Sequence, residues 1–133
     1  MARLLYSLLL TLLLPLLLTR LFIKGSSDNR YRRNIGDRLG KVTRYLGKID
    51  VWIHAVSVGE VNAATPLVTA FQTKRPHCRI LITTTTPTGL DQVTVRLGDR
   101  VVHCYLPFDH PFFIARFLHI ISPRLLIIME REL

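Results

Sequence analysis

Cysteine is scarce in this 133-residue sequence, which has only Cys78 and Cys104, at a separation that matches no zinc pattern. That scarcity excludes a disulfide-rich secreted scaffold, and we interpret both thiols as small buried side chains in a reducing compartment. Glycine-rich phosphate loops are missing too, because neither G-x-G-x-x-G nor a Walker lysine motif occurs. The five histidines lack ligand spacing to one another, so we expect no metal and no cofactor. His54 and His103 fall within predicted strands, which favours core positions for both.

Acidic residues are few: nine Asp and Glu stand against eighteen Lys and Arg, which gives a formal net charge of +9. The excess lies in residues 1–48, which hold ten Lys and Arg and two Asp, whereas residues 49–133 are almost neutral. A nucleic-acid-binding domain would carry basic charge on its folded surface. We therefore expect no nucleic acid among the partners and assign the basic residues to a segment near a membrane.

A long hydrophobic run occupies residues 4–23 and is broken by Pro15 and Arg20. As a helix it extends about 30 Å, close to one hydrocarbon thickness. The Lys and Arg residues that follow predict a cytoplasmic location for that side and attraction to anionic lipids of the membrane. A cleaved signal peptide is the competing interpretation, but no small-x-small cleavage site follows Leu18. The sequence leaves open whether this helix crosses the bilayer fully or lies partly in its interface.

The rest of the chain alternates between apolar strands and amphipathic helices. Strands are predicted at 51–56, 79–84, 101–105 and 125–129, and the helices between them at 60–73, 86–97 and 109–120. This alternation indicates an open α/β fold, a Rossmann-like parallel sheet with flanking helices. We divide the chain into a membrane anchor at 1–23, a basic connector at 24–50 and an α/β domain at 51–133.

Polar segments follow three of the strands, at the sheet edge where such folds bind ligands. Ser57 and Glu60 form an S-x-x-E capping box, so Glu60 is either a helix cap or a carboxylate presented as a base beside Gly59. Residues 84–89 form a threonine-rich loop, either a helix cap or a set of hydroxyls for a polar ligand. Glu130, after the last strand, is either a ligand contact or part of a solvated chain end.

Four ordered segments go beyond a generic α/β pattern. They are residues 53–60 (IHAVSVGE), 83–89 (TTTTPTG), 105–109 (YLPFD) and 116–118 (RFL). Together they resemble the N-terminal part of the bacterial 3-deoxy-D-manno-octulosonic acid (Kdo) transferases. The resemblance covers essentially the whole chain and includes the N-terminal anchor.

The resemblance implies the N-terminal, acceptor-binding half of an inverting, GT-B-type glycosyltransferase of lipopolysaccharide synthesis. Such enzymes transfer Kdo from CMP-Kdo to the lipid A precursor, lipid IVA, at the cytoplasmic face of the bacterial inner membrane. The family's catalytic base corresponds to Glu60 and the preceding glycine to Gly59. We expect the acceptor contacts at Ser57, Gly59, Thr86, Thr88, Gly89 and Glu130.

Two departures from the family pattern affect the expected activity. Arg131 stands where the family has threonine, and the C-terminal domain that binds the CMP group is absent from these 133 residues. We therefore expect a truncated fragment that is inactive by itself. The alternatives are a non-catalytic, membrane-anchored interaction domain whose open sheet edge pairs with another chain, and a lipid-surface adaptor that works only through its basic segment.

Overall fold

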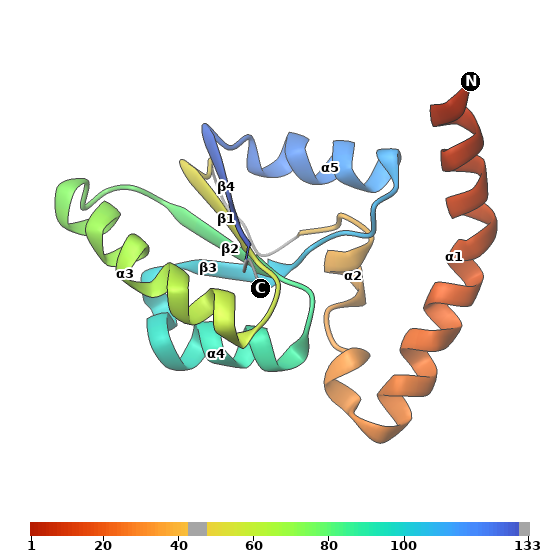
Figure 1. Cartoon of the computed structure of the whole chain (residues 1–133), viewed down its shortest axis with the longest axis horizontal. Coiled ribbons are helices and arrows are strands. Elements are labelled where there is room, and N and C mark those ends of the chain that lie inside the picture. The colour runs from red at the N-terminus through yellow and green to blue at the C-terminus, as the bar shows by residue number, and fades with distance from the viewer. Residues whose placement is uncertain (43–47, 131–133) are drawn as a thin grey trace.

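The computed structural model describes residues 1–42 and 48–130 of the chain. Its first element is the helix α1 (Ala2–Ser27), which stands beside the remaining elements in Figure 1. The helix passes through Pro15 without ending, and its mean hydropathy and length suffice to cross a membrane. Only 6% of its most apolar window is buried, so this hydrophobic surface is largely uncovered. The predicted anchor is therefore a helix, and it extends four residues beyond Ile23.

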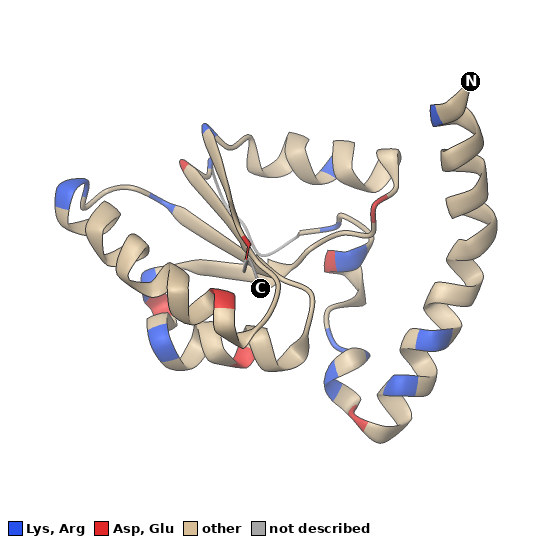
Figure 2. Cartoon of the chain, in the orientation of Figure 1, with Lys and Arg blue, Asp and Glu red and all other residues tan. Residues whose placement is uncertain are grey.

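The basic connector contains two short helical segments, η1 (Asn29–Tyr31) and α2 (Ile35–Arg38). Figure 2 shows Lys and Arg gathered at the C-terminal end of α1 and in the segment that follows. Not all of this charge is available to a membrane. Arg38 is buried, and Arg30 pairs with both Asp28 and Asp91. The predicted connector residues 43–47 lie outside the described part of the chain.

Four parallel strands form one sheet in the order β3-β2-β1-β4. They are β1 (Val51–Ala55), β2 (Ile80–Thr84), β3 (Val102–Tyr105) and β4 (Leu125–Met129). The two central strands are buried almost throughout, as their continuous apolar sequences predict. The α/β prediction is confirmed, with each strand boundary within one residue of the expected one.

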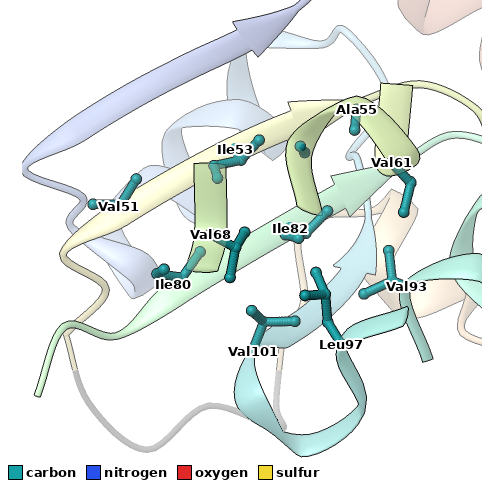
Figure 3. Close-up of a cluster of buried hydrophobic side chains, with 11 residues drawn as sticks. Val51, Ile53, Ala55, Val61, Val68, Ile80, Ile82, Val93, Leu97 and Val101 are labelled. Atoms are coloured by element: carbon teal, nitrogen blue, oxygen red, sulfur yellow. The ribbon is translucent and has the colours of Figure 1, made fainter. Parts of the chain in front are cut away.

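Helices cover both faces of the sheet. On one face lie α3 (Val58–Lys74) and α4 (Pro87–Leu97), followed by the short η2 (Gly98–Arg100). Figure 3 shows the apolar side chains of β1 and β2 packed against these two helices, with Val61 and Val68 of α3 fully buried. Burying such side chains contributes roughly 1.5–3 kcal/mol each, so this layer is a main source of stability.

The opposite face is covered by α5 (Pro111–Ile121). Its Phe117 packs edge-on against Trp52 of β1, with ring centroids 5.1 Å apart, and both side chains are buried. The indole N–H of Trp52 donates to the Thr83 hydroxyl at 2.8 Å, so the polar atom buried with the ring is satisfied. Cys104 is buried in the same layer, as predicted, whereas Cys78 is only partly buried.

The edge strand β4 is covered unevenly. Ile127 and Met129 pack against the α3 layer, whereas Leu126 and Ile128 on the other face are 43% and 58% exposed. We expected one face of this strand to be uncovered, either at Leu125, Ile127 and Met129 or at their neighbours. The neighbours Leu126 and Ile128 form the uncovered face, because α3 reaches across β1 to Ile127 and Met129.

Candidate active site

The strand order places a switch point between β1 and β4. The chain leaves β1 toward β2 and enters β4 from β3, on the far side of the sheet, so neighbouring β1 and β4 have connections running in opposite directions. Ligands of open α/β sheets bind outside the carboxyl ends of strands at such a point. A cavity of about 210 Å³ lies there, lined by Gly59, Glu60, Ala63, Met129 and Glu130.

Glu60 lies in the first turn of α3 and lines this cavity. Its carboxylate accepts the backbone N–H of Ser57 at 3.2 Å and also the Ser57 hydroxyl, which completes the predicted capping box. The positive end of the helix dipole stabilises a carboxylate in this position. The two interpretations of Glu60 are therefore compatible, because one side chain both caps α3 and faces the cavity.

Two carboxylates from distant parts of the chain meet at this cavity. Glu130 follows β4 and is exposed, and it lies opposite the start of α3. Gly59 has no side chain, so the backbone at the start of α3 is open to the cavity. Within residues 1–42 and 48–130, no group of three His, Cys, Asp or Glu side chains is placed to hold a metal ion. The arrangement suits proton transfer to or from a bound hydroxyl.

The threonine-rich loop contributes chiefly to structure. Thr86 caps α4 by accepting the Gly89 N–H at 3.1 Å, which confirms the predicted cap. A Cβ on Gly89 would lie 2.9 Å from the Thr86 hydroxyl, so this glycine allows close packing. Thr88 is exposed, with its hydroxyl 3.4 Å from that of Thr86. None of these three residues lines the cavity that Glu60 and Glu130 share.

Sequence reasoning missed one residue that supports this loop. Arg38, which we had counted among the basic residues near the membrane, is 7% exposed and donates to the Thr85 carbonyl at 3.0 Å. Its guanidinium lies 4.3 Å from the centroid of the Tyr105 ring, and burial lowers the pKa of Arg38. Its partners are more than forty residues away, so no local pattern signals the contact. Arg38 thus ties the connector to the loop after β2.

A larger cavity of about 530 Å³ lies at the opposite edge of the sheet. Residues at the amino ends of β1 and β4, including Val51 and Leu125, line it together with Arg75 and Arg124. It contains no residue that the sequence marked as a candidate for catalysis. We assign the candidate active site to the smaller cavity, because it lies at the switch point of the sheet and is lined by both Glu60 and Glu130.

The family model and the relatives that match this chain are all described as 3-deoxy-D-manno-octulosonic acid transferases. The family model described as 3-deoxy-D-manno-octulosonic-acid transferase (kdotransferase) matches residues 33–133. The 3-deoxy-D-manno-octulosonic acid transferase of Haemophilus influenzae is 42% identical over 139 residues, covering 100% of this chain and 32% of that protein. The transferase of Rickettsia bellii is 34% identical over 97% of this chain and 31% of its own length.

A plant protein also matches: the probable mitochondrial 3-deoxy-D-manno-octulosonic acid transferase of Arabidopsis thaliana is 40% identical over 83 residues, 62% of this chain and 19% of that protein. This chain spans about a third of the length of the two bacterial relatives that it matches along nearly its whole length. The matched range 33–133 includes the four motifs and the residues that line the cavity. The chain belongs to the 3-deoxy-D-manno-octulosonic-acid transferase family.

Proposed function

We propose that these residues form the acceptor-binding domain of a glycosyltransferase of the GT-B type. The reaction transfers Kdo from CMP-Kdo to a hydroxyl of the lipid A precursor, lipid IVA, in lipopolysaccharide synthesis. The observation that supports this most directly is the position of Glu60, in the cavity at the switch point of the sheet. The domain that would bind CMP-Kdo corresponds to the remaining two thirds of the relatives.

In the proposed mechanism Glu60 is the general base. Its carboxylate takes the proton of the acceptor hydroxyl while that oxygen bonds to the anomeric carbon of Kdo, and CMP leaves with the electrons of the broken bond. A single displacement of this kind inverts the anomeric configuration. The hydrogen bonds from Ser57 hold the carboxylate in one orientation, which reduces the reorganisation that proton transfer requires. No metal or cofactor takes part in this scheme.

The remaining candidate residues bind the acceptor around this base. Glu130 accepts a hydrogen bond from a sugar hydroxyl on the other side of the cavity, and Gly59 lets the sugar approach the backbone. Thr88 presents an exposed hydroxyl, while Thr86 and Gly89 shape the loop that carries it. The acceptor is anchored in the bilayer, so its head group reaches this edge from the membrane side.

We further propose that α1 attaches the protein to the bacterial inner membrane, with the α/β domain on its cytoplasmic face. The helix has the length and hydropathy for a membrane, and five cationic side chains between residues 24 and 48 are exposed in the described part of the chain: Lys24, Arg32, Arg33, Lys41 and Lys48. Cations beside an apolar segment attract anionic lipid head groups. They also suit a phosphorylated lipid acceptor.

A chimera tests the function. The 133 residues would replace the matching first third of the Haemophilus influenzae relative, and Kdo transfer would be assayed with CMP-Kdo and lipid IVA. We expect activity in the parent chimera and a loss of about 10²–10⁴-fold on Glu60→Gln, because general-base removal has that effect. Asp99→Asn, an exposed carboxylate on η2, is the matched control and should leave the rate unchanged.

The outcomes separate the two candidate functions. Activity of the Gln variant within about twofold of the parent means that Glu60 is only a cap, because a base contributes far more than that. A folded chimera with no activity at all favours the alternative, a membrane-anchored interaction domain. The exposed edge of β4, with Leu126 and Ile128, is the surface that would then pair with another chain.

A further inference from the structure

Two polar contacts join the first half of α1 to the start of α5. The Tyr6 hydroxyl donates to an oxygen of Asp109 at 2.6 Å, and the Thr11 hydroxyl lies 3.0 Å from Nε2 of His110. In Figure 1 the N-terminal end of α5 turns toward the N-terminal half of α1. When α1 lies along the membrane interface, one of the two arrangements that the sequence leaves open, these contacts bring the start of α5 to the membrane with it.

Only one stripe of α1 is directed at the protein. The buried and half-buried residues of α1 recur mostly every three or four positions: Ser7, Leu10, Leu14, Leu17, Leu18, Leu21 and Gly25. Leucines between them, such as Leu12 and Leu16, are about 70% exposed. The side chains of this stripe do not pack fully against α5, and a groove of about 350 Å³ remains between the two helices.

The α5 side of this groove is apolar. It consists of Pro111, Ile114, Ala115 and Leu118, which share one face of the helix at positions i, i+3, i+4 and i+7. Leu118 is 40% exposed there, while Phe117 of the same helix is buried under the sheet. The α1 side carries Arg3, Tyr6 and Ser7, and Asp109, which precedes α5 and accepts the hydrogen bond from Tyr6, completes the lining. Thus α5 is apolar toward the sheet and also toward the groove.

The chemistry of the groove walls indicates what could bind between these two helices. Apolar walls favour hydrocarbon over water, and lipid acyl chains surround the exposed face of α1. Arg3 supplies a cation for a phosphate at the groove, and Arg116, with its guanidinium 4.5 Å from the Phe112 ring, supplies another on α5. Phe112 is 56% exposed, and Phe is one of the side chains that interfacial helices direct into a membrane.

We infer that the groove between α1 and α5 holds an acyl chain of an anionic bilayer phospholipid, which makes α5 a second membrane contact beside α1. The inference rests on the proposed membrane attachment of α1. It adds that the α/β domain is not merely tethered: the start of α5 sits in the interface. The orientation of the domain on the bilayer is then fixed by two elements instead of one.

Photo-crosslinking tests this inference. The whole chain would be placed in phosphatidylcholine vesicles that contain phosphatidylglycerol with a diazirine on its acyl chain, and adducts would be mapped by mass spectrometry. We expect adducts on α1 and on the peptide that contains Pro111 to Leu118. Ala115→Trp should lower the α5 adducts about tenfold, because an indole in the middle of the groove blocks the space that the chain would occupy. The α1 adducts serve as the internal reference and should persist.

Ala70→Trp is the matched control, since it places the same side chain on an exposed position of α3 away from the groove. Circular dichroism would verify that both variants fold. Adducts on α1 without adducts on α5 overturn this inference alone, whereas adducts on neither helix overturn the proposed membrane attachment. Loss of the α5 adducts on adding lipid IVA, but not phosphatidylglycerol, assigns the groove to the acceptor and overturns the phospholipid. Cross-links between protein copies there overturn it in favour of a dimer.

Discussion

Glu60 carries the main functional hypothesis and also has a structural role, and the two can be separated by substitution. Its carboxylate closes the capping box with Ser57, yet the same side chain lines the cavity with Glu130. Glutamine keeps an oxygen that can accept the Ser57 N–H, but it cannot act as a base. Alanine removes both the cap and the base. Stability and activity therefore respond differently to the two substitutions.

We predict that Glu60→Gln leaves the free energy of unfolding of the chimera nearly unchanged, whereas Glu60→Ala lowers it by about 0.5–1 kcal/mol through loss of the cap. Urea unfolding monitored by circular dichroism measures both values. Kdo transfer should fall in both variants. Equal stability of the two variants would show that the capping hydrogen bonds contribute little, and it would leave the catalytic hypothesis to the rate measurement.

His54 predicts a pH dependence of stability. Its Nδ1 lies 2.9 Å from the Thr83 hydroxyl, which accepts the indole N–H of Trp52 and so has its own hydrogen left to donate. Burial lowers the pKa of His54, so the unfolded chain binds a proton more readily than the folded chain. The stabilisation that the folded chain gains from neutral His54 is fully present above the unfolded pKa of about 6.5, and it is lost as the pH falls below that value toward the lower pKa of the folded state.

We predict that unfolding free energy, measured in urea between pH 7.5 and 5.5, decreases less for His54→Gln than for the parent. Glutamine can keep a hydrogen bond to Thr83 but does not titrate. Thr83→Val removes the hydroxyl and leaves the imidazole, so it separates the effect of the hydrogen bond from the effect of the titrating group. An identical pH dependence of parent and His54→Gln would assign the acid sensitivity to other groups.

At the scale of elements, local patterns predicted the four strands of the described sheet and their positions along the chain. Apolar runs marked the strands, and the helices expected at 86–97 and 109–120 begin in the structure at Pro87 and Pro111, where proline suits the first helical position. Contacts between distant segments escaped prediction. Burial of Arg38 under Tyr105 and the reach of α3 to Ile127 depend on how elements pack, which no window of neighbouring residues encodes.

The candidate site, too, could be predicted from local patterns only in part. The sequence placed Glu60 and Glu130 at strand ends, but their meeting in one cavity follows from the adjacency of β1 and β4. The threonine loop was left open between cap and ligand contact, and Thr86 is a cap in the structure. Whether Thr88 also binds acceptor remains a prediction from the family resemblance.

The cap of α4 gives a prediction for a single element. Thr86→Ala should lower the free energy of unfolding by about 1 kcal/mol, because the Gly89 N–H loses its acceptor at the helix start. Thr88→Ala, two residues further along the chain and exposed, should change stability by less than about 0.5 kcal/mol. Urea unfolding of the two variants compares them directly. Equal losses would contradict the cap assignment.

At the scale of the whole molecule, the proposed membrane attachment has an apolar part and an ionic part. We predict that deleting residues 1–23 releases the protein from anionic vesicles only partly at low salt, since the exposed cations from Lys24 to Lys48 remain. Each contributes about 1 kcal/mol near an anionic surface, and salt screens it. Sedimentation at low and high salt measures the bound fraction. Adding Arg32→Gln and Arg33→Gln should weaken the remaining binding, and salt-independent release would contradict the two-part attachment.

The last prediction concerns the 133 residues on their own. Without the rest of the relatives' length we expect no Kdo transfer, and we expect aggregation through the exposed edge of β4. Because neighbouring residues of a strand face opposite sides, Ile127 and Ile128 form a matched pair. Ile127→Thr, on the packed face, should cost about 1–2 kcal/mol of stability. Ile128→Thr, on the face that is 58% exposed, should leave stability nearly unchanged and reduce aggregation. Light scattering and thermal unfolding in detergent measure both effects, and equal destabilisation by the two substitutions would mean that the outer face of β4 is covered in solution.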